Sequence, residues 1–261
     1  MVHFVGAGPG APDLITLRGQ ALLKEADCVI YAGSLVNPEL LRVTKEGCRI
    51  CNSAYMTLDE VIGVMKETES AGLMTVRLHT GDPSLYGAVR EQMDRLDSLG
   101  ISWDVTPGVS SFCAAAASLG MEYTLPGISQ SVIITRMEGR TAVPERESVR
   151  ELASHGATMV FFLSAGMIPE LCQALISGGY AADTPAAVVC RASWPDELTA
   201  VTDLAHLPEE AERLEIRKTA LIIVGKAAAQ TGYSLSKLYD PSFSTEYRTA
   251  GKSPRTLSDF T

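Results

Sequence analysis

The chain has 261 residues, and its 22 Lys and Arg against 31 Asp and Glu give a formal net charge of −9. Hydrophobic residues make up 46% and charged residues 20%, which is typical of a globular protein with a sizeable core. The acidic balance argues against broad nucleic-acid binding, and no apolar run of about 18 residues predicts a membrane span. The N-terminal residues lack a basic stretch followed by an apolar one, so we expect a cytoplasmic protein without a secretory signal.

Cysteine and histidine usage argues against a bound metal. The chain has 6 Cys and 4 His, and Cys48-x-x-Cys51 has the spacing of a metal clip. No second Cys pair follows at zinc-ribbon distance, and no His pair completes a finger. We therefore expect reduced, structural cysteines and no protein-bound metal.

The first half alternates short apolar runs with amphipathic segments, which is typical of an α/β fold. Thr16 and Asn37 are expected helix N-caps, and Thr57-x-x-Glu60 reads as a capping box. Strands are expected at 3–7, 28–31, 49–51, 73–78 and 103–105, with helices at 16–25, from 57, from 84 and around 110–117.

The pattern restarts after Leu125-Pro126-Gly127, which has the chemistry of a turn. Strands are expected at 132–135, 159–163, 187–190, 198–201 and 220–224, with helices at 145–154, 169–177 and 204–214. We therefore predict two α/β domains, 1–122 and 123–232, followed by a tail at 233–261. Two such domains suggest a ligand site in the cleft between them, near the carboxyl ends of strands.

The first glycine loop, residues 6–11, has the form G-x-G-x-x-A of a dinucleotide-binding loop. Pro9 and Pro12 each lack an N–H that a phosphate cradle would use, and no acidic residue follows Tyr31. NAD binding is therefore disfavoured. The small residues instead predict a backbone wall that a large ligand can approach closely.

Other strand exits carry polar residues with two open interpretations each. Asp82 could interact with a helix dipole, or it could bind a ligand ammonium or hydroxyl group. Ser110 and Ser111 could be helix caps alone or part of a site. His79 is expected to pack or to form a hydrogen bond rather than to act as a base. Arg136 and Arg140 could be solvated surface charges or could bind carboxylates.

Several motifs taken together resemble a known family. They are Gly6-Ala7-Gly8-Pro9-Gly10, Tyr31-Ala32-Gly33-Ser34-Leu35-Val36, Thr80-Gly81-Asp82-Pro83, Pro107-Gly108-Val109-Ser110-Ser111 and, in the tail, Ser236-Lys237-Leu238-Tyr239-Asp240-Pro241. The chain resembles the tetrapyrrole methyltransferases that use S-adenosylmethionine, over nearly its whole length. Within that family it is similar to the precorrin-4 C11-methyltransferases, including the cobalt-precorrin-4 form.

The resemblance implies a two-domain α/β fold with the methyl donor in the cleft, a homodimer, and no residue that acts as a covalent catalyst. Asp82 would hold the charged methionine end of the donor. The residues expected to contact the donor are Pro9, Thr80, Gly81, Asp82, Leu85, Ser110, Ser111, Leu163 and Ala192. Those expected to contact the tetrapyrrole are Ser34, Ser53, Met56, Arg136 and Arg140.

One departure from the family bears on the reaction. Uroporphyrinogen-III methyltransferases carry an Asp where this chain has Ala32, and a Lys near the position of Asn52 and Ser53. Their absence argues for a later methylation in corrin synthesis. The alternatives are a sister methyltransferase acting at another ring carbon, a tetrapyrrole carrier without catalysis, and a nucleotide-binding oxidoreductase. The sequence leaves open whether the macrocycle already holds cobalt.

Overall fold

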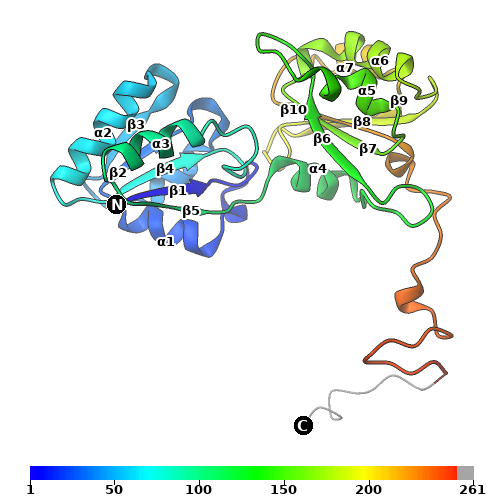
Figure 1. Cartoon of the computed structure of the whole chain (residues 1–261), viewed down its shortest axis with the longest axis horizontal. Helices are drawn as coiled ribbons and strands as arrows, with labels where there is room; N and C mark the ends of the chain where they lie inside the picture. The colour runs from blue at the N-terminus through cyan, green and yellow to red at the C-terminus, as the bar shows by residue number, and fades with distance from the viewer. Residues whose placement is uncertain (252–261) are drawn as a thin grey trace.

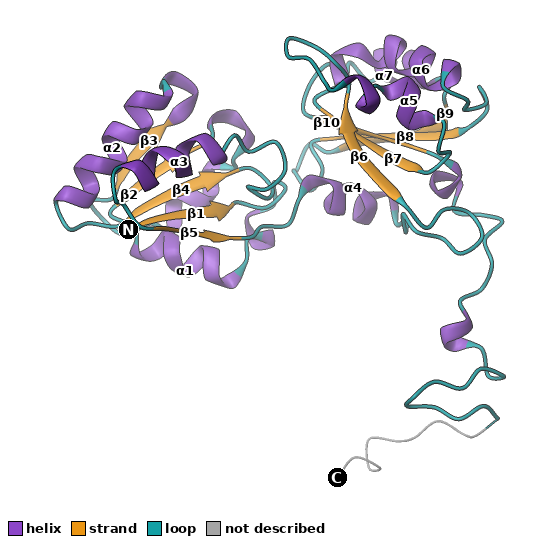
Figure 2. Ribbon diagram, in the orientation of Figure 1, coloured by secondary structure: helices purple, strands orange, loops and turns teal. Residues whose placement is uncertain are grey.

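The structure, a computed structural model, describes residues 1–251, apart from the side chain of Ser34. It contains two five-stranded sheets, each with helices on both faces (Figures 1 and 2). Each sheet has its own buried clusters of apolar side chains. The predicted α/β fold class is confirmed.

The first sheet is wholly parallel, with the strand order β3-β2-β4-β1-β5. Its strands are β1 (Val2–Gly6), β2 (Cys28–Tyr31), β3 (Arg49–Asn52), β4 (Thr75–His79) and β5 (Trp103–Thr106). Because all five run the same way, the loops that follow β1, β4 and β5 emerge at one edge. The pairing of Gly6 with His79 and of Val5 with Thr106 places these strand ends side by side.

Two helices of this half, α1 (Leu17–Glu25) and α2 (Leu58–Ser70), begin where their capping residues predict. α1 packs on one face, while α2 and α3 (Arg90–Ser98) cover the other (Figure 2). The Thr16 hydroxyl accepts a hydrogen bond from the N–H of Gly19, and Thr57 forms the predicted capping box with Glu60. Short 3-10 segments span Pro12–Leu14, Gly33–Leu35, Pro38–Val43 and Ser53–Tyr55.

The second sheet is mixed, in the order β6-β7-β10-β8-β9. Its strands are β6 (Val132–Arg136), β7 (Thr158–Phe162), β8 (Pro185–Cys190), β9 (Leu198–Asp203) and β10 (Ala220–Val224). β10 runs antiparallel to both of its neighbours, β7 and β8. The start of β10 therefore lies at the edge where β7 and β8 end.

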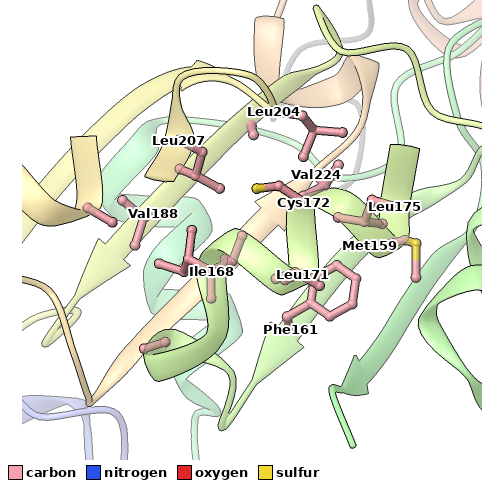
Figure 3. Packing of buried hydrophobic residues seen from close by; sticks show 14 of the residues in the cluster. Met159, Phe161, Ile168, Leu171, Cys172, Leu175, Val188, Leu204, Leu207 and Val224 are labelled. Carbon is pink, nitrogen blue, oxygen red and sulfur yellow. The ribbon is translucent and has the colours of Figure 1, made fainter. Parts of the chain in front are cut away.

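α5 (Val149–Ala153), α6 (Ile168–Ser177) and α7 (Leu207–Arg213) cover one face of this sheet, and α4 (Ser111–Leu119) covers the other (Figure 1). Figure 3 shows the core under α6 and α7, which includes Phe161, Leu171, Leu175 and Val224. Short 3-10 segments span Glu145–Glu147, Ala165–Met167, Lys226–Ala229 and Lys237–Tyr239.

The packing of α4 bears on where the two halves divide. Ala114 and Ala115 are buried in one cluster with Val160 and Ile223 of the second sheet. We therefore propose that the division falls before α4. The expected boundary between residues 122 and 123 stays a prediction.

The helix predicted from Ser84 is wrong at its start, because α3 begins only at Arg90. The intervening residues form turns, with positive φ of 54° at Tyr86 and 49° at Ala88. A Cβ at Gly87 would lie 2.2 Å from the carbonyl oxygen of Pro83, so only glycine fits this tight bend. The apolar residues that suggested an earlier helix instead belong to a loop, in which Leu85 and Tyr86 line the cavity and Val89 packs against the core of the first half.

The tail leaves the second half at Ser234, whose N–H donates to the carbonyl of Pro126 at 2.8 Å. Beyond this point the arm extends away from both sheets (Figure 1). The guanidinium of Arg248 donates to backbone carbonyls of Leu238 and Asp240 and so holds the arm in a compact turn. The last part of the predicted tail, residues 252–261, lies outside the described residues.

Among the helices of residues 1–251, none has the length and apolar character needed to cross a bilayer.

Candidate functional site

A cavity of about 520 Å³ lies between the two halves. Its walls come from the loops after β1, β4 and β5 in the first half, and from the ends of β7 and β8 and the start of β10 in the second. This volume is within the range of small-molecule sites, which favour interfaces between domains.

The first-half loops approach one another closely at Gly6, Gly81 and Gly108. A Cβ at Gly6 would lie 2.5 Å from the Cα of Gly108, and one at Gly108 would lie 2.1 Å from the carbonyl oxygen of Gly81. Gly8 and Gly81 also exchange backbone hydrogen bonds of 3.2 and 2.9 Å. The loops after β1, β4 and β5 therefore form one continuous wall that no side chain separates, which fits the predicted backbone surface.

Among residues 1–251, Asp82 is the one acidic residue that lines the cavity. Its Oδ2 accepts a hydrogen bond from the N–H of Gly108 at 2.8 Å, and its Oδ1 accepts from the N–H of Ser84 at 2.9 Å. Burial would raise the pKa of Asp82, but the hydrogen bonds from Ser84 and Gly108 outweigh it and lower the pKa below the ordinary value. The carboxylate is thus ionised at neutral pH. Its Oδ1 also accepts from the Ser84 hydroxyl, which leaves about one of the four acceptor sites of a carboxylate for a ligand.

Thr80 and Ser110 hold the neighbouring wall. The Thr80 hydroxyl donates to the carbonyl of Leu35 at 3.0 Å and so ties the loop after β4 to the one after β2. Ser110 stands at the N-cap of α4, but its buried side chain makes no capping hydrogen bond. Capping therefore does not account for the Ser110 hydroxyl, which lines the cavity together with Ser111.

The second half presents backbone in an uncommon conformation. Leu163, Arg191 and Thr219 all line the cavity, and each has φ of 54° without being glycine. Such left-handed conformations are uncommon for residues with a side chain and gather at functional sites. Leu163 is 67% exposed, so its apolar side chain faces open space at the end of β7. These observations indicate that the edge of the second sheet where β7 and β8 end and β10 begins is part of the site.

Trp194 joins the two halves. Its Nε1 donates to the carbonyl of Pro9 at 3.1 Å, and its ring lies where a Cβ at Gly10 would be 2.2 Å away. The Arg191 guanidinium lies 4.3 Å from the centre of the same ring. The N–H of Ala11 donates to the Ser193 hydroxyl at 3.0 Å. The glycine loop after β1 is therefore fixed directly against the second half.

The structure brings the predicted donor-contacting residues together. The residues Pro9, Thr80, Gly81, Asp82, Leu85, Ser110, Ser111, Leu163 and Ala192 all line this one cavity. They come from five segments of the sequence. Their contact with a methyl donor stays a prediction.

Four of the five residues expected to contact a tetrapyrrole, Ser53, Met56, Arg136 and Arg140, lie outside the cavity wall. The Ser53 hydroxyl donates to the carbonyl of Tyr31 at 3.0 Å, and Met56 packs against the core of the first half. The Arg136 guanidinium donates to backbone carbonyls of residues 137, 141 and 142 and so braces its own loop. Arg140 is exposed, and the side chain of Ser34 lies outside the described part of the structure.

Sequence reasoning missed several lining residues, namely Leu35, Tyr86, Phe162, Arg191, Trp194, Arg217, Lys218 and Thr219. Leu35 lies within a motif already singled out, and Tyr86 directly follows the predicted site residue Leu85, so both loops carried a signal. The Arg217-Lys218 pair precedes a strand, whereas ligand loops were sought after strands. Only the antiparallel direction of β10 brings this pair to the site.

His79 lies beside the site but is 3% exposed and stacks on Phe4 with ring centres 6.0 Å apart. Burial, reinforced by the nearby charge of Arg77, lowers the pKa of His79 to about 3. The imidazole is therefore neutral at physiological pH, in agreement with the packing role expected from the sequence.

Among residues 1–251, no three His, Cys, Asp or Glu side chains gather as metal ligands.

Two α/β halves enclosing such a cavity have the architecture of a methyltransferase family. The model of the Tetrapyrrole (Corrin/Porphyrin) Methylases matches residues 1–208. The chain belongs to this family.

Relatives within the family are similar over almost the full chain. The cobalt-precorrin-4 C(11)-methyltransferase of Methanocaldococcus jannaschii is 52% identical over 251 residues, covering 96% of this chain and 97% of that protein. The precorrin-4 C(11)-methyltransferase of Rhodococcus erythropolis is 46% identical, covering 91% and 96%.

Solved structures agree. A cobalt-precorrin-4 methyltransferase of cobalamin biosynthesis superimposes with a TM-score of 0.85 at 44% identity, covering 87% of this chain and 95% of that one. The uroporphyrin-III C-methyltransferase of Thermus thermophilus, solved with S-adenosylhomocysteine, has a TM-score of 0.73 at 28% identity, covering 88% and 99%.

Proposed function

We propose that the protein transfers a methyl group from S-adenosylmethionine to C11 of precorrin-4 or cobalt-precorrin-4, giving the corresponding precorrin-5A in cobalamin biosynthesis. The observation that carries this proposal is the gathering of the predicted donor-contacting residues around one cavity. The sequence identity of 52% to a cobalt-precorrin-4 C(11)-methyltransferase, over nearly the whole length, supports the position of methylation.

The residues of the cavity fit the donor. Leu85, Val189 and Leu221 supply apolar walls suited to an adenine ring and a thioether chain. The Ser110 hydroxyl and the ionised Asp82 supply hydrogen-bonding partners for ribose hydroxyls and for an ammonium group. Asp82 is therefore proposed to hold the charged amino-acid end, with both of its oxygens already oriented by Gly108 and Ser84.

The bound donor supplies a methyl group that its positively charged sulfur already activates for displacement by an electron-rich ring carbon. The chain therefore needs no covalent catalyst. Its contribution is to fix the donor in the cleft and to exclude water, since orientation alone can supply roughly 7–11 kcal/mol of a barrier. The glycine-packed loops and Trp194 give the rigidity that such positioning requires.

The macrocycle is proposed to lie over the cleft, with contacts to Ser34, Ser53, Met56, Arg136 and Arg140. Arg136 would act through the loop that it braces, because three backbone carbonyls already occupy its guanidinium. Arg140, which is exposed, is the better placed of the two for a substrate carboxylate.

A homodimer in the cytoplasm completes the proposal. The arm after Ser234 exposes 86% of Leu235 and 79% of both Tyr239 and Tyr247, which suits a contact with a second copy. Sedimentation of the full chain and of a chain ending at residue 232 tests this. The full chain is expected to be dimeric, and a monomeric full chain would contradict the proposal.

Methyl transfer is tested by incubating the protein with S-adenosylmethionine labelled in its methyl carbon and with precorrin-4 or cobalt-precorrin-4 in parallel. Mass spectrometry and carbon NMR are expected to show one label at C11, and the faster substrate identifies the pathway. Label at another carbon would indicate a sister methyltransferase. Macrocycle binding without transfer would indicate a carrier, and NAD binding an oxidoreductase.

A further inference from the structure

The charge on the cavity wall is opposite to that of the whole chain. In the described part of the chain four charged residues line it, the acidic Asp82 and the basic Arg191, Arg217 and Lys218, in a protein of net charge −9. Arg191 is neutralised by Asp196, with 2.7 Å between Nε and Oδ1, and lies over Trp194. Within residues 1–251, the side chains of Arg217 and Lys218 have no ion pair and no hydrogen bond. The second half thus offers two uncommitted cations at the site.

The backbone holds this pair in a constrained turn between α7 and β10. Glu215 and Thr219 flank the pair, and both have positive φ, of 55° and 54°. Ile216 is buried and anchors the turn, while the carbonyl of Lys218 accepts a hydrogen bond from the Cys190 thiol at 3.7 Å. Non-glycine residues keep such conformations only where the surroundings enforce them, which is common at ligand sites.

The topology places this turn at the cavity rather than on the far surface. Ala220, the first residue of β10, pairs with Cys190, the last residue of β8. Arg217 and Lys218 therefore lie beside the strand end that carries Arg191 and Ala192. They come from the half opposite to Asp82, so the acidic and basic groups of the wall are supplied by different halves.

We propose that Arg217 and Lys218 together bind a ligand carboxylate at the second-half wall of the cavity. The proposal deepens the function proposed above and rests on it for the ligand class. An acidic protein repels polyanions at long range, so a local cationic edge is needed to hold one. Arginine offers a planar fork and lysine a compact charge, and both suit carboxylates. Two ligands carry this group: the tetrapyrrole on its acetate and propionate chains, and the donor on its amino-acid end.

The experiment uses the full chain with Arg217→Gln, Lys218→Gln and the double variant. Arg213→Gln is the matched control, because Arg213 lies on the preceding helix, is paired with Glu210 and does not line the cavity. Calorimetry measures binding of S-adenosylhomocysteine and of 5′-methylthioadenosine, which lacks the carboxylate. Fluorescence quenching measures binding of uroporphyrin, a stable tetrapyrrole with eight carboxylates, at low and high salt.

Each single variant is expected to weaken one carboxylate probe by about tenfold, the size of one charged hydrogen bond, and to reduce its salt dependence. Weaker uroporphyrin binding with unchanged S-adenosylhomocysteine assigns the pair to the substrate. Weaker S-adenosylhomocysteine binding with unchanged methylthioadenosine assigns it to the donor. Unchanged affinity for both carboxylate probes in the double variant overturns the proposal.

Two further readouts separate the possible failures. Lys218→Arg keeps the charge and is expected to bind within about twofold of the wild type. If the double variant does not fold, the contrast between Lys218→Arg and Lys218→Gln decides the matter, and equal affinities of these two variants and of Arg217→Gln with the wild type overturn the proposal. Wild-type protein that binds both probes but methylates neither precorrin-4 form would overturn the proposed function and leave the carboxylate site standing. Normal methylation with an unchanged KM in the double variant would overturn the site alone.

Discussion

The N–H of Gly108 donates a hydrogen bond to Oδ2 of Asp82 at 2.8 Å, and this bond joins the loop after β5 to the loop after β4. The other carboxylate oxygen accepts from the N–H of Ser84 within its own loop. Asp82 therefore holds the two loops in place and also supplies a negative charge to the cavity. The helix-dipole role that the sequence left open is wrong, because α3 begins only at Arg90. The bonds to Gly108 and Ser84 remain compatible with the other interpretation, a ligand role for the same carboxylate.

Asp82→Asn is expected to lower the free energy of unfolding at pH 7 by about 1–2 kcal/mol, because a charged acceptor of two backbone N–H groups is lost. The pKa of Asp82 is lowered in the folded state, so its charge contributes stability above the ordinary pKa of an aspartate. That contribution is lost as the pH falls through the folded-state value. Urea unfolding at pH 7 and at pH 3 measures the difference between wild type and variant.

The difference is expected to be largest at pH 7 and to shrink toward pH 3, because the pKa of Asp82 in the folded state lies below the ordinary value. Asp94→Asn is the control, since Asp94 is exposed and paired only with Arg90 on the same helix. Equal stabilities of wild type and Asp82→Asn at pH 7 would contradict the structural role of the carboxylate.

Gly108→Ala is expected to prevent correct assembly of the site, because a Cβ there would lie 2.1 Å from the carbonyl oxygen of Gly81 and 2.7 Å from the Cα of Gly6. Backbone cannot yield as a flexible side chain can, so the cost exceeds about 3 kcal/mol. Gly63→Ala is the opposite case, since α2 leaves open space there, and should stabilise by about 0.5–1 kcal/mol. Thermal unfolding of both variants makes the comparison, and a Gly108→Ala protein as stable as the wild type would refute the close packing.

Trp194→Phe is expected to weaken donor binding by about fivefold with little loss of stability. The variant keeps a ring beside Gly10 but removes the hydrogen bond to the Pro9 carbonyl, an interaction worth about 1 kcal/mol. Calorimetry with S-adenosylhomocysteine gives the affinity. Trp103→Phe, in which the lost hydrogen bond is to Asp97 at the surface of the first half, should leave that affinity unchanged.

His79 is expected to make the protein less stable as the medium becomes mildly acidic. The pKa of His79 is about 3 in the folded state and about 6.5 in the unfolded chain, so below pH 6.5 the unfolded chain binds the extra proton. Between pH 6.5 and pH 5 this costs about 2 kcal/mol, at 1.36 kcal/mol per pH unit.

Replacing His79 by Phe should flatten this slope in urea unfolding measured from pH 7.5 to pH 5. The exposed His206 pairs with Asp203, which raises its pKa, so His206→Gln should not flatten the slope. An unchanged slope in the His79→Phe protein would show that the buried imidazole is not its source.

Much of the fold was predictable because local signals and tertiary packing agree. The strand 220–224 has the predicted bounds, and Thr16 and Thr57 begin their helices as expected. The segment from Ser84 failed because a single glycine contact with Pro83 overrides the apolar spacing. Helix periodicity cannot reveal such a contact, since it depends on how the chain folds back on itself.

The site was predictable where ligand loops follow parallel strands, as with Thr80 and Ser110. It was not predictable where chain direction decides the outcome. Arg217 and Lys218 precede β10, and only the antiparallel pairing of β10 with β7 and β8 brings them to the cavity. Strand direction is set by long-range pairing, which a one-dimensional pattern does not encode.

The cavity walls are supplied by two sheets with separate cores, and this couples ligand affinity to the cohesion of the molecule. A ligand that contacts both walls favours the arrangement in which the two halves are together. At a concentration of about 100 times its dissociation constant, it stabilises that arrangement by about 2.7 kcal/mol. Without a ligand, the contacts between Trp194 and the loop of Pro9 and Gly10 help to hold the two halves together. Protease cleavage in the crossing after β5 should therefore slow when the ligand is added.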